Sequence, residues 1–339
     1  MGNLRFFSLV LPNFVFLKTL PHSLAYLPRH PEPPPFLPPH RPAPPTAPWT
    51  LPTAPSTPPL PLTSAFASST STPRAPRRSQ TPSWGSSSAS SAAIEVMKML
   101  SIRSVGLSLS LQKGLPLGSG LGSSAASAAA AAVAVNEMFG KRLSVEDLVV
   151  ASLKSEEKVS GYHADNVAPS IMGGFVLIQS YEPLQLIELM FPAEKELYFV
   201  LVSPEFEAPT KKMRAALPSE IGMAHHVWNC SQAGALVAAV LKGDVVGLGK
   251  ALSSDKIVEP RRAPLIPGIE AVKKAALQAG AFGCTISGAG PTAVAVIDDE
   301  STGHAIAQHM IQAFLSHGNL KASAKVLQLD RLGARRILD

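Results

Sequence analysis

The chain has 339 residues, enough for two domains of average size, and its net charge of +6 and its 32 prolines are unevenly spread. The first 94 residues hold 21 prolines, seven Lys or Arg and one acid, whereas the remaining 245 hold 23 bases and 23 acids. Because these 245 residues have no net charge, they argue against a nucleic-acid-binding protein, which would carry a basic patch on its folded part. Two cysteines exclude a disulfide scaffold, and no apolar run reaches the roughly 20 residues of a membrane span.

Residues 1–91 are predicted to be a disordered tail. Its proline runs remove backbone donors, and its Ser- and Thr-rich stretches offer little apolar area to bury. The stretch from Leu62 to Ser91 is rich in Ser, Thr, Ala and Arg and contains no acid, a composition typical of an organelle transit peptide. We therefore expect a location in the chloroplast stroma. An ordinary extension on a cytoplasmic protein, or a chain start foreign to this protein, is the alternative.

From about Ala92 the periodicity of apolar residues predicts helices and strands in mixed order. Helices are expected at Ile94–Leu100, Ser123–Phe139, Ser144–Val159, Ile221–Leu241, Ile269–Ala279 and Gly303–Leu315. Strands are expected at Val105–Leu111, Phe175–Gln179, Tyr198–Val202, Cys284–Ser287 and Ala293–Ile297. Because the two kinds do not strictly alternate, the pattern predicts an α+β fold.

The most informative segment is a glycine-rich stretch that reads GLPLGSGLGSSAA over residues 114–126. Its alternating glycines allow sharp turns, and Ser123 and Ser124 then open a helix whose unpaired amides and positive dipole end suit a phosphate. Ser123 stands where a Walker loop needs lysine and where the dinucleotide fingerprint needs its third glycine, so both are excluded. The alternative is a turn that only caps a buried alanine helix.

This stretch resembles the second signature of the GHMP kinases, Pro-x-Gly-x-Gly-Leu-Gly-Ser-Ser-Ala, and SGAGPT at 287–292 resembles the third. The resemblance implies a two-domain α+β kinase fold, with a ribosomal protein S5 domain 2-like part at 92–182 and a ferredoxin-like part at 183–339. It implies that Ser124 and Glu156 hold Mg²⁺ and are the catalytic pair. It also implies ATP on a loop made of Pro116, Leu117, Gly118, Ser119, Gly120, Leu121, Gly122, Ser123, Ser124, Ala125 and Ala126.

Three further segments are similar to those of family members that phosphorylate homoserine, and to plant versions most closely. The resemblance assigns the substrate pocket to His163, Asn166, Thr210, Arg214 and Arg262. Independently of the family, a planar guanidinium recognises a carboxylate well. The alternatives are that Arg214 is a solvated charge on a helix, that His163 is an ordinary polar residue with satisfied hydrogen bonds, and that Asp165 and Asn166 cap a helix.

The resemblance thus implies transfer of the ATP γ-phosphoryl group to the side-chain hydroxyl of L-homoserine, giving O-phospho-L-homoserine for threonine biosynthesis. It also implies a homodimer, with no nucleic-acid or membrane partner. The family's first signature, roughly Pro-Ala-Thr-x-Ala-Asn-Leu-Gly-Pro-Gly-Phe-Asp, is not recognisable in residues 1–91. Three hypotheses follow: a working kinase with a diverged first segment, a truncated non-catalytic relative that binds nucleotide or a partner, or a GHMP kinase for another substrate such as mevalonate. His163, Asn166 and Arg262 speak against the third.

Overall fold

The computed structural model describes residues 87–115, 118–157 and 161–336, which all belong to one unit of the chain. The predicted tail up to residue 86 lies outside the described residues, and so do Pro116 and Leu117 of the predicted ATP loop. Within the described ranges, no helix combines the length and the apolar character needed to cross a bilayer.

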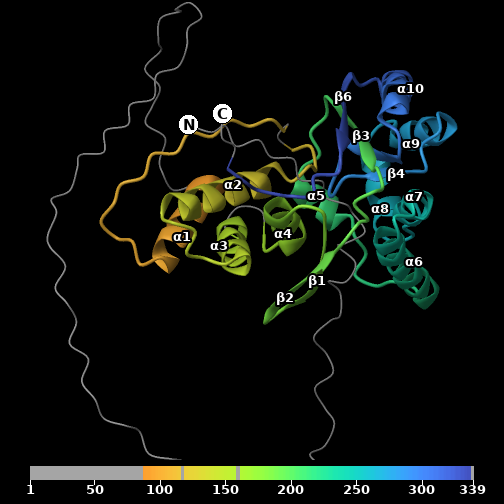
Figure 1. The fold of residues 1–339 in the computed structure, drawn as a ribbon. Coiled ribbons are helices and arrows are strands. Elements are labelled where there is room, and N and C mark those ends of the chain that lie inside the picture. The colour runs from red at the N-terminus through yellow and green to blue at the C-terminus, as the bar shows by residue number, and fades with distance from the viewer. Residues whose placement is uncertain (1–86, 116–117, 158–160, 337–339) are drawn as a thin grey trace, which may run out of the picture. The chain divides into compact units, whose positions relative to one another are not determined.

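Four helices pack together in the N-terminal half of the described chain (Figure 1). They are α1 (Ser88–Met99), α2 (Ser123–Met138), α3 (Val145–Glu157) and α4 (Ala164–Met172). Helix α2 is buried along most of its length, because its run of alanines lets the other three helices approach closely. Beside them, β1 (Phe175–Tyr181) and β2 (Leu184–Leu189) form a two-stranded antiparallel sheet.

The first ordered helix begins earlier than the sequence predicts. Helix α1 starts at Ser88 rather than near Ala92, because Ser87 caps it: the Ser87 hydroxyl accepts from the Ser90 backbone N–H at 3.3 Å. The C-terminal end of the serine-rich stretch, which the sequence predicts to be disordered, therefore supplies the N-cap and the first turn of α1.

The strand expected at Val105–Leu111 is wrong. The alternation predicted a buried side correctly only at the centre of the segment: Leu107 and Leu109 pack against the helical core, but Val105 and Leu111, on the same side of the alternation, are 52% and 43% exposed. A strand needs a partner for its backbone hydrogen bonds. This segment pairs with no other strand in the part of the chain that the structure describes.

The C-terminal half is built on a four-stranded antiparallel sheet in the order β4-β5-β3-β6. Its strands are β3 (Tyr198–Pro204), β4 (Gly283–Ile286), β5 (Ala293–Ile297) and β6 (Ala322–Gln328). Helices α9 (Ile269–Gln278) and α10 (Glu300–Gly318) cover one face, and α6 (Met223–Lys242) and α7 (Val245–Leu252) cover the other (Figure 1).

Both faces of this sheet are therefore apolar. Along β3, Val200 and Val202 belong to the core that includes α9 and α10, whereas Phe199 and Leu201 point to the other face, where they line a small cavity together with Leu121. The predicted strands that correspond to β1, β3, β4 and β5 are confirmed, as are the predicted helices that correspond to α2, α3, α6, α9 and α10, each within a few residues.

The sequence pattern did not predict β2, β6, α4, α5, α7 or α8, and three of these, α4, α5 and α8, carry predicted substrate residues. Helix α5 (Thr210–Ala215) and helix α8 (Glu259–Arg262) are one to two turns long, and α8 continues into the 3₁₀ turn η2 (Ala263–Leu265). Such lengths are too short for apolar periodicity to be visible. Tertiary contacts, rather than local pattern, hold these turns in place.

Candidate functional site

Two glycine-rich segments far apart in the sequence lie against each other. We call residues 118–122 the glycine loop and residues 287–292 the SGAGPT turn. The Ser287 hydroxyl donates to the Gly120 carbonyl at 2.9 Å, and the Thr292 backbone N–H donates to the Ser119 carbonyl at 3.3 Å. Because the turn joins β4 to β5 and the loop leads into α2, this contact fixes the start of α2 against one end of the C-terminal sheet.

Gly120 is required where the two segments meet. Its φ is +78°, in the left-handed region that favours glycine. A Cβ at this position would lie 2.7 Å from the Gly290 carbonyl oxygen and 2.9 Å from the Gly290 nitrogen, and closer still to the Ser287 carbonyl oxygen. These are backbone atoms that cannot swing aside, so only glycine fits the observed contact.

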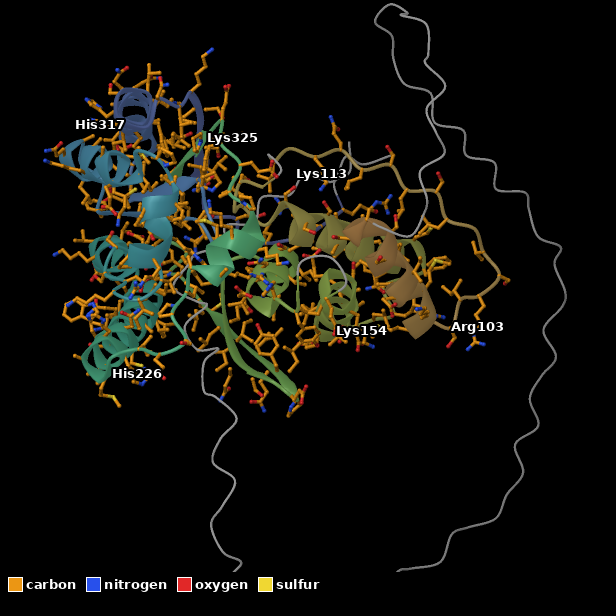
Figure 2. The ribbon with its side chains drawn as sticks, turned by 180° about the vertical axis from the view of Figure 1, so that it is seen from behind. Arg103, Lys113, Lys154, His226, His317 and Lys325 are labelled. Atoms are coloured by element: carbon orange, nitrogen blue, oxygen red, sulfur yellow. The ribbon has the colours of Figure 1, made fainter. Side chains whose placement is uncertain are left out.

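The glycine loop delivers an open helix N-terminus. Gly122 has φ +69° and gives α2 no side-chain cap, and the first turn of α2 carries no acidic residue. The first amides of a helix have no intrahelical acceptors, and the helix dipole places partial positive charge there. This end of α2 can therefore receive a phosphate group. The segment that leads into the loop is tied to β6, where the Lys325 ammonium, labelled in Figure 2, donates to the Gly114 carbonyl at 3.0 Å.

The structure brings the two predicted metal-binding residues together. Ser124, in the first turn of α2, donates its hydroxyl to Oε1 of Glu156 on α3 at 2.6 Å. The Ser88 Oγ of α1 lies 2.6 Å from the Ser124 Oγ. Since the single Ser124 proton goes to the carboxylate, Ser88 is the donor of this second bond.

This pair suits a hard cation. Glu156 is 1% exposed, so its carboxylate sits at the helix end in a site largely closed to water. Mg²⁺ prefers oxygen ligands and is commonly held by one or two protein oxygens together with substrate phosphates. Across the described ranges, no group of three or more His, Cys, Asp or Glu could hold an ion by itself. An ion here would need phosphate oxygens as well.

Arg262, at the end of α8, is a buried cation beside the SGAGPT turn. It is 5% exposed, and it donates from Nε to the Met213 carbonyl at 3.3 Å and from Nη1 to the Gly288 carbonyl at 2.8 Å. Burial, and then the positive charge of Arg214, lower its pKa, while Asp255 raises it. No ion pair joins it to a carboxylate among the described residues. The site thus holds a desolvated positive charge that an anion would neutralise.

His163 and Arg214 meet from different halves of the chain. His163 is the N-cap residue of α4, and its Nε2 contacts the Arg214 guanidinium of α5. The Gly161 backbone packs beside both side chains. Arg214 is exposed overall, so the solvated-charge alternative describes its surface position but not this contact.

The other predicted substrate residues are less fully defined. Asn166 and Asp165 lie in the first turn of α4 rather than at its cap, and the Asn166 Oδ1 is buried without a hydrogen-bond partner among the described residues. An amide oxygen of this kind can accept from an ammonium or hydroxyl group. Thr210 begins α5, but its side chain is outside the described part of the structure.

The site as a whole runs from the N-terminal end of α2, across the SGAGPT turn, to two arginines and a histidine. The turn contacts the glycine loop through Ser287 and Arg262 through Gly288. Sequence reading missed Ser88 and the carbonyl groups of Met213 and Gly288. A backbone acceptor carries no side-chain signal, and Ser88 is one serine in a run of them.

Comparisons with known proteins agree with this geometry. Residues 88–174 match the family profile "GHMP kinases N terminal domain", and residues 236–317 match "GHMP kinases C terminal". A homoserine kinase of Arabidopsis thaliana is 74% identical over 246 residues, which are 73% of this chain and 66% of that protein. A homoserine kinase of Chlorobium phaeovibrioides is 46% identical over 231 residues, 68% of this chain and 71% of that protein.

A solved structure gives the same result. The crystal structure of homoserine kinase from Cytophaga hutchinsonii aligns with a TM-score of 0.70 and 38% identity, covering 75% of this chain and 80% of that one. The joined glycine segments, the two profiles and this alignment define a GHMP kinase, so the predicted fold class is confirmed.

Within that class, the chain belongs to the homoserine kinase family. Membership in a kinase family implies ATP as the phosphoryl donor. The chain spans just under two thirds of the length of the Arabidopsis relative and 71% of the Chlorobium relative.

Proposed function

We propose that this chain transfers the γ-phosphoryl group of ATP to the side-chain hydroxyl of L-homoserine. The observation that supports this most strongly is the double contact of the SGAGPT turn. Two adjacent residues at the start of the turn make these contacts: the Ser287 hydroxyl donates to the glycine loop, and the Gly288 carbonyl accepts from the buried Arg262 guanidinium. A phosphate-binding helix end and a carboxylate-binding cation are therefore held at a fixed separation.

On the nucleotide side, the amides at the start of α2 would bind the phosphates of ATP. Ser124 and Glu156 fit Mg²⁺, because they offer a hydroxyl and a buried carboxylate beside that helix end. When bound, the ion would neutralise charge on the transferred phosphoryl group. Ser88 would orient the Ser124 hydroxyl by donating to it.

On the acceptor side, Arg262 and Arg214 would bind the homoserine carboxylate, and the Asn166 amide oxygen would accept from its ammonium or hydroxyl group. Phosphoryl transfer depends mainly on alignment and charge neutralisation, so this assignment requires no dedicated general base. Holding the two reactants at a fixed separation is the main contribution of the protein.

The test is a coupled ADP-release assay with ATP, Mg²⁺ and L-homoserine. We expect turnover that depends on homoserine, and we expect Arg262→Ala to raise the KM for homoserine by about 10- to 100-fold, the loss of a charge-assisted contact. Arg261→Ala is the matched control, because Arg261 is adjacent in α8 but exposed, and it should leave KM unchanged. Nucleotide binding without turnover, or turnover with mevalonate in place of homoserine, would refute the proposal.

We also propose a homodimer located in the chloroplast stroma. Met223 and Val227, one turn apart on α6, are 73% and 60% exposed, an apolar face that a second copy of the chain could cover. Sedimentation of a monomer at micromolar concentration would contradict the dimer. A fluorescent protein fused after residue 91 that stays in the cytosol of plant cells would contradict the location.

A further inference from the structure

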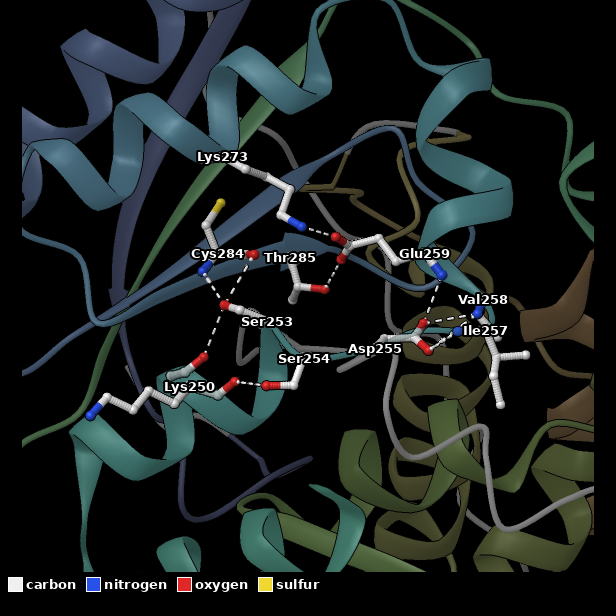
Figure 3. Close-up of polar contacts among 11 residues, drawn as sticks. Lys250, Ser253, Ser254, Asp255, Ile257, Val258, Glu259, Lys273, Cys284 and Thr285 are labelled. Atoms are coloured by element: carbon white, nitrogen blue, oxygen red, sulfur yellow. Dashed lines mark hydrogen bonds and ion pairs between the residues drawn. The ribbon is translucent and has the colours of Figure 1, made fainter. Parts of the chain in front are cut away.

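A buried polar cluster is built on Glu259, the first residue of α8 (Figure 3). Its carboxylate accepts from the Thr285 hydroxyl of β4 at 2.6 Å and forms an ion pair with the Lys273 ammonium of α9. Glu259 is 8% exposed, and the Lys273 side chain is 15% exposed. Removing two charges from water costs several kcal/mol, and well-packed apolar residues would stabilise a core at least as well. The cluster therefore calls for a role besides stability.

That role is indicated by the shortness of α8. A four-residue helix does not hold its shape alone, so contacts at its start decide where Arg262 lies at its end. Asp255 caps the start, accepting from the backbone N–H groups of Ile257 at 2.8 Å, Val258 at 3.1 Å and Glu259 at 2.6 Å (Figure 3). Capping fixes the direction of α8, and the Glu259 side chain fixes its position on the sheet.

Glu259 and Arg262 are anchored to the same stretch of chain. Thr285, which binds Glu259, lies three residues before Gly288, which accepts from Arg262 Nη1 at 2.8 Å. Because residues three apart in a helix are neighbours, these contacts close a ring from Arg262 through α8 and Glu259 to β4 and back along the SGAGPT turn. A shift of α8 would break one anchor or the other.

We propose that Glu259, supported by Lys273 and Thr285, is a positioning residue that holds the Arg262 guanidinium for the substrate carboxylate. The inference rests on the proposed function, since it assumes that Arg262 binds homoserine. It adds that the rigidity of this arginine comes from a buried ion pair at the start of α8. Glu259 itself touches no reacting group.

The kinetic test compares Glu259→Gln with the native chain. The amide keeps the size of the side chain but loses the ion pair, and we expect the KM for homoserine to rise about tenfold while the KM for ATP changes by less than about twofold. In an Arg262→Ala background the same substitution should add less than about twofold, because the residue it positions is already gone. Lys273→Arg, which keeps the charge, should retain most of the native KM.

A second readout does not depend on activity. The Arg262 Nε–H donates to the Met213 carbonyl in a buried site, so it should give a slowly exchanging signal in a ¹H–¹⁵N spectrum, assigned by its loss in Arg262→Lys. Glu259→Gln should broaden or shift that signal in the absence of substrate. If the native chain lacks homoserine turnover, the proposed function fails, and this spectrum still decides whether Glu259 positions Arg262.

The matched control is Asn136→Leu. Asn136 is equally buried and holds the Leu143 backbone with two hydrogen bonds, but it contacts no part of α8. The Asn136→Leu variant should be less stable than the native chain but should keep the native KM for homoserine and for ATP. Should Glu259→Gln fail to fold, Thr285→Val removes one anchor with little change of shape and should raise the KM for homoserine in the same direction. The proposal would be overturned if folded Glu259→Gln left both the KM for homoserine and the Arg262 signal unchanged. It would also be overturned if Glu259→Gln raised the KM for homoserine as much in the Arg262→Ala background as in the native chain.

Discussion

Replacing Gly120 with alanine tests whether the glycine loop and the SGAGPT turn must touch for the proposed kinase activity. The substitution adds one methyl group, in a backbone conformation that costs alanine about 1–2 kcal/mol. The methyl would also lie within 3 Å of backbone atoms of Ser287 and Gly290. The two segments must then separate by roughly 1 Å, a displacement that costs about 100-fold in rate when it misaligns reactants.

Separation also weakens the two hydrogen bonds between the segments, worth about 1 kcal/mol each. Together with the backbone cost, Gly120→Ala should lower the free energy of unfolding by about 3–4 kcal/mol. Urea unfolding followed by far-ultraviolet circular dichroism measures this quantity, and the ADP-release assay measures kcat on the folded fraction.

Two other glycines serve as controls that separate the cost of the backbone conformation from the cost of the close contact. Gly140 has φ +87°, and a methyl group added there would meet no atom within 4 Å, so Gly140→Ala reports the conformational cost alone. Gly114 has neither constraint, and Gly114→Ala should be neutral or slightly stabilising. If Gly120→Ala loses no more stability than Gly140→Ala and keeps native kcat, the close contact is not required and the reasoning is refuted.

Two further predictions concern Ser124 and the thiols. Ser124→Ala should raise the Mg²⁺ concentration for half-maximal rate by about 10- to 100-fold, because it removes the hydroxyl paired with Glu156; an unchanged Mg²⁺ titration would argue against that role. Burial raises the pKa of Cys284 from 9.0 to about 12, so its contribution to stability is complete below pH 9 and declines as the pH rises to 12. Between these limits, the free energy of unfolding of the native chain should fall by roughly 1 kcal/mol per pH unit more than that of Cys284→Ala. Urea titrations at several alkaline pH values that give both chains the same dependence of this free energy on pH would contradict the prediction. In the folded chain Ellman's reagent should modify the exposed Cys230 but not Cys284, and two reactive thiols would disprove the burial.

Much of the fold could be predicted because its main elements are long and locally patterned. The alanines of α2 and the apolar runs of β3 and β5 show their class over 5 to 16 residues. The glycine loop was equally visible, since glycines at alternate positions before a helix favour a tight turn with exposed amides. The segment at 105–111 shows the limit of such reasoning, because alternation reports that a side is apolar, but neither that all of it is buried nor that a partner strand is present.

The candidate site likewise has a part that the sequence predicts and a part that only the structure shows. The sequence by itself determined which residue types were available, including the serines at the start of α2, Glu156 and the two arginines. Only the tertiary structure decided that Ser287 meets Gly120 across 167 residues, that Ser88 supports Ser124, and that Glu259 anchors α8 through Thr285. The physical reason is that hydrogen bonds and burial depend on atoms brought together by the folded backbone. A buried charge such as Glu259 looks in sequence like any solvated acid until the packing shows what surrounds it.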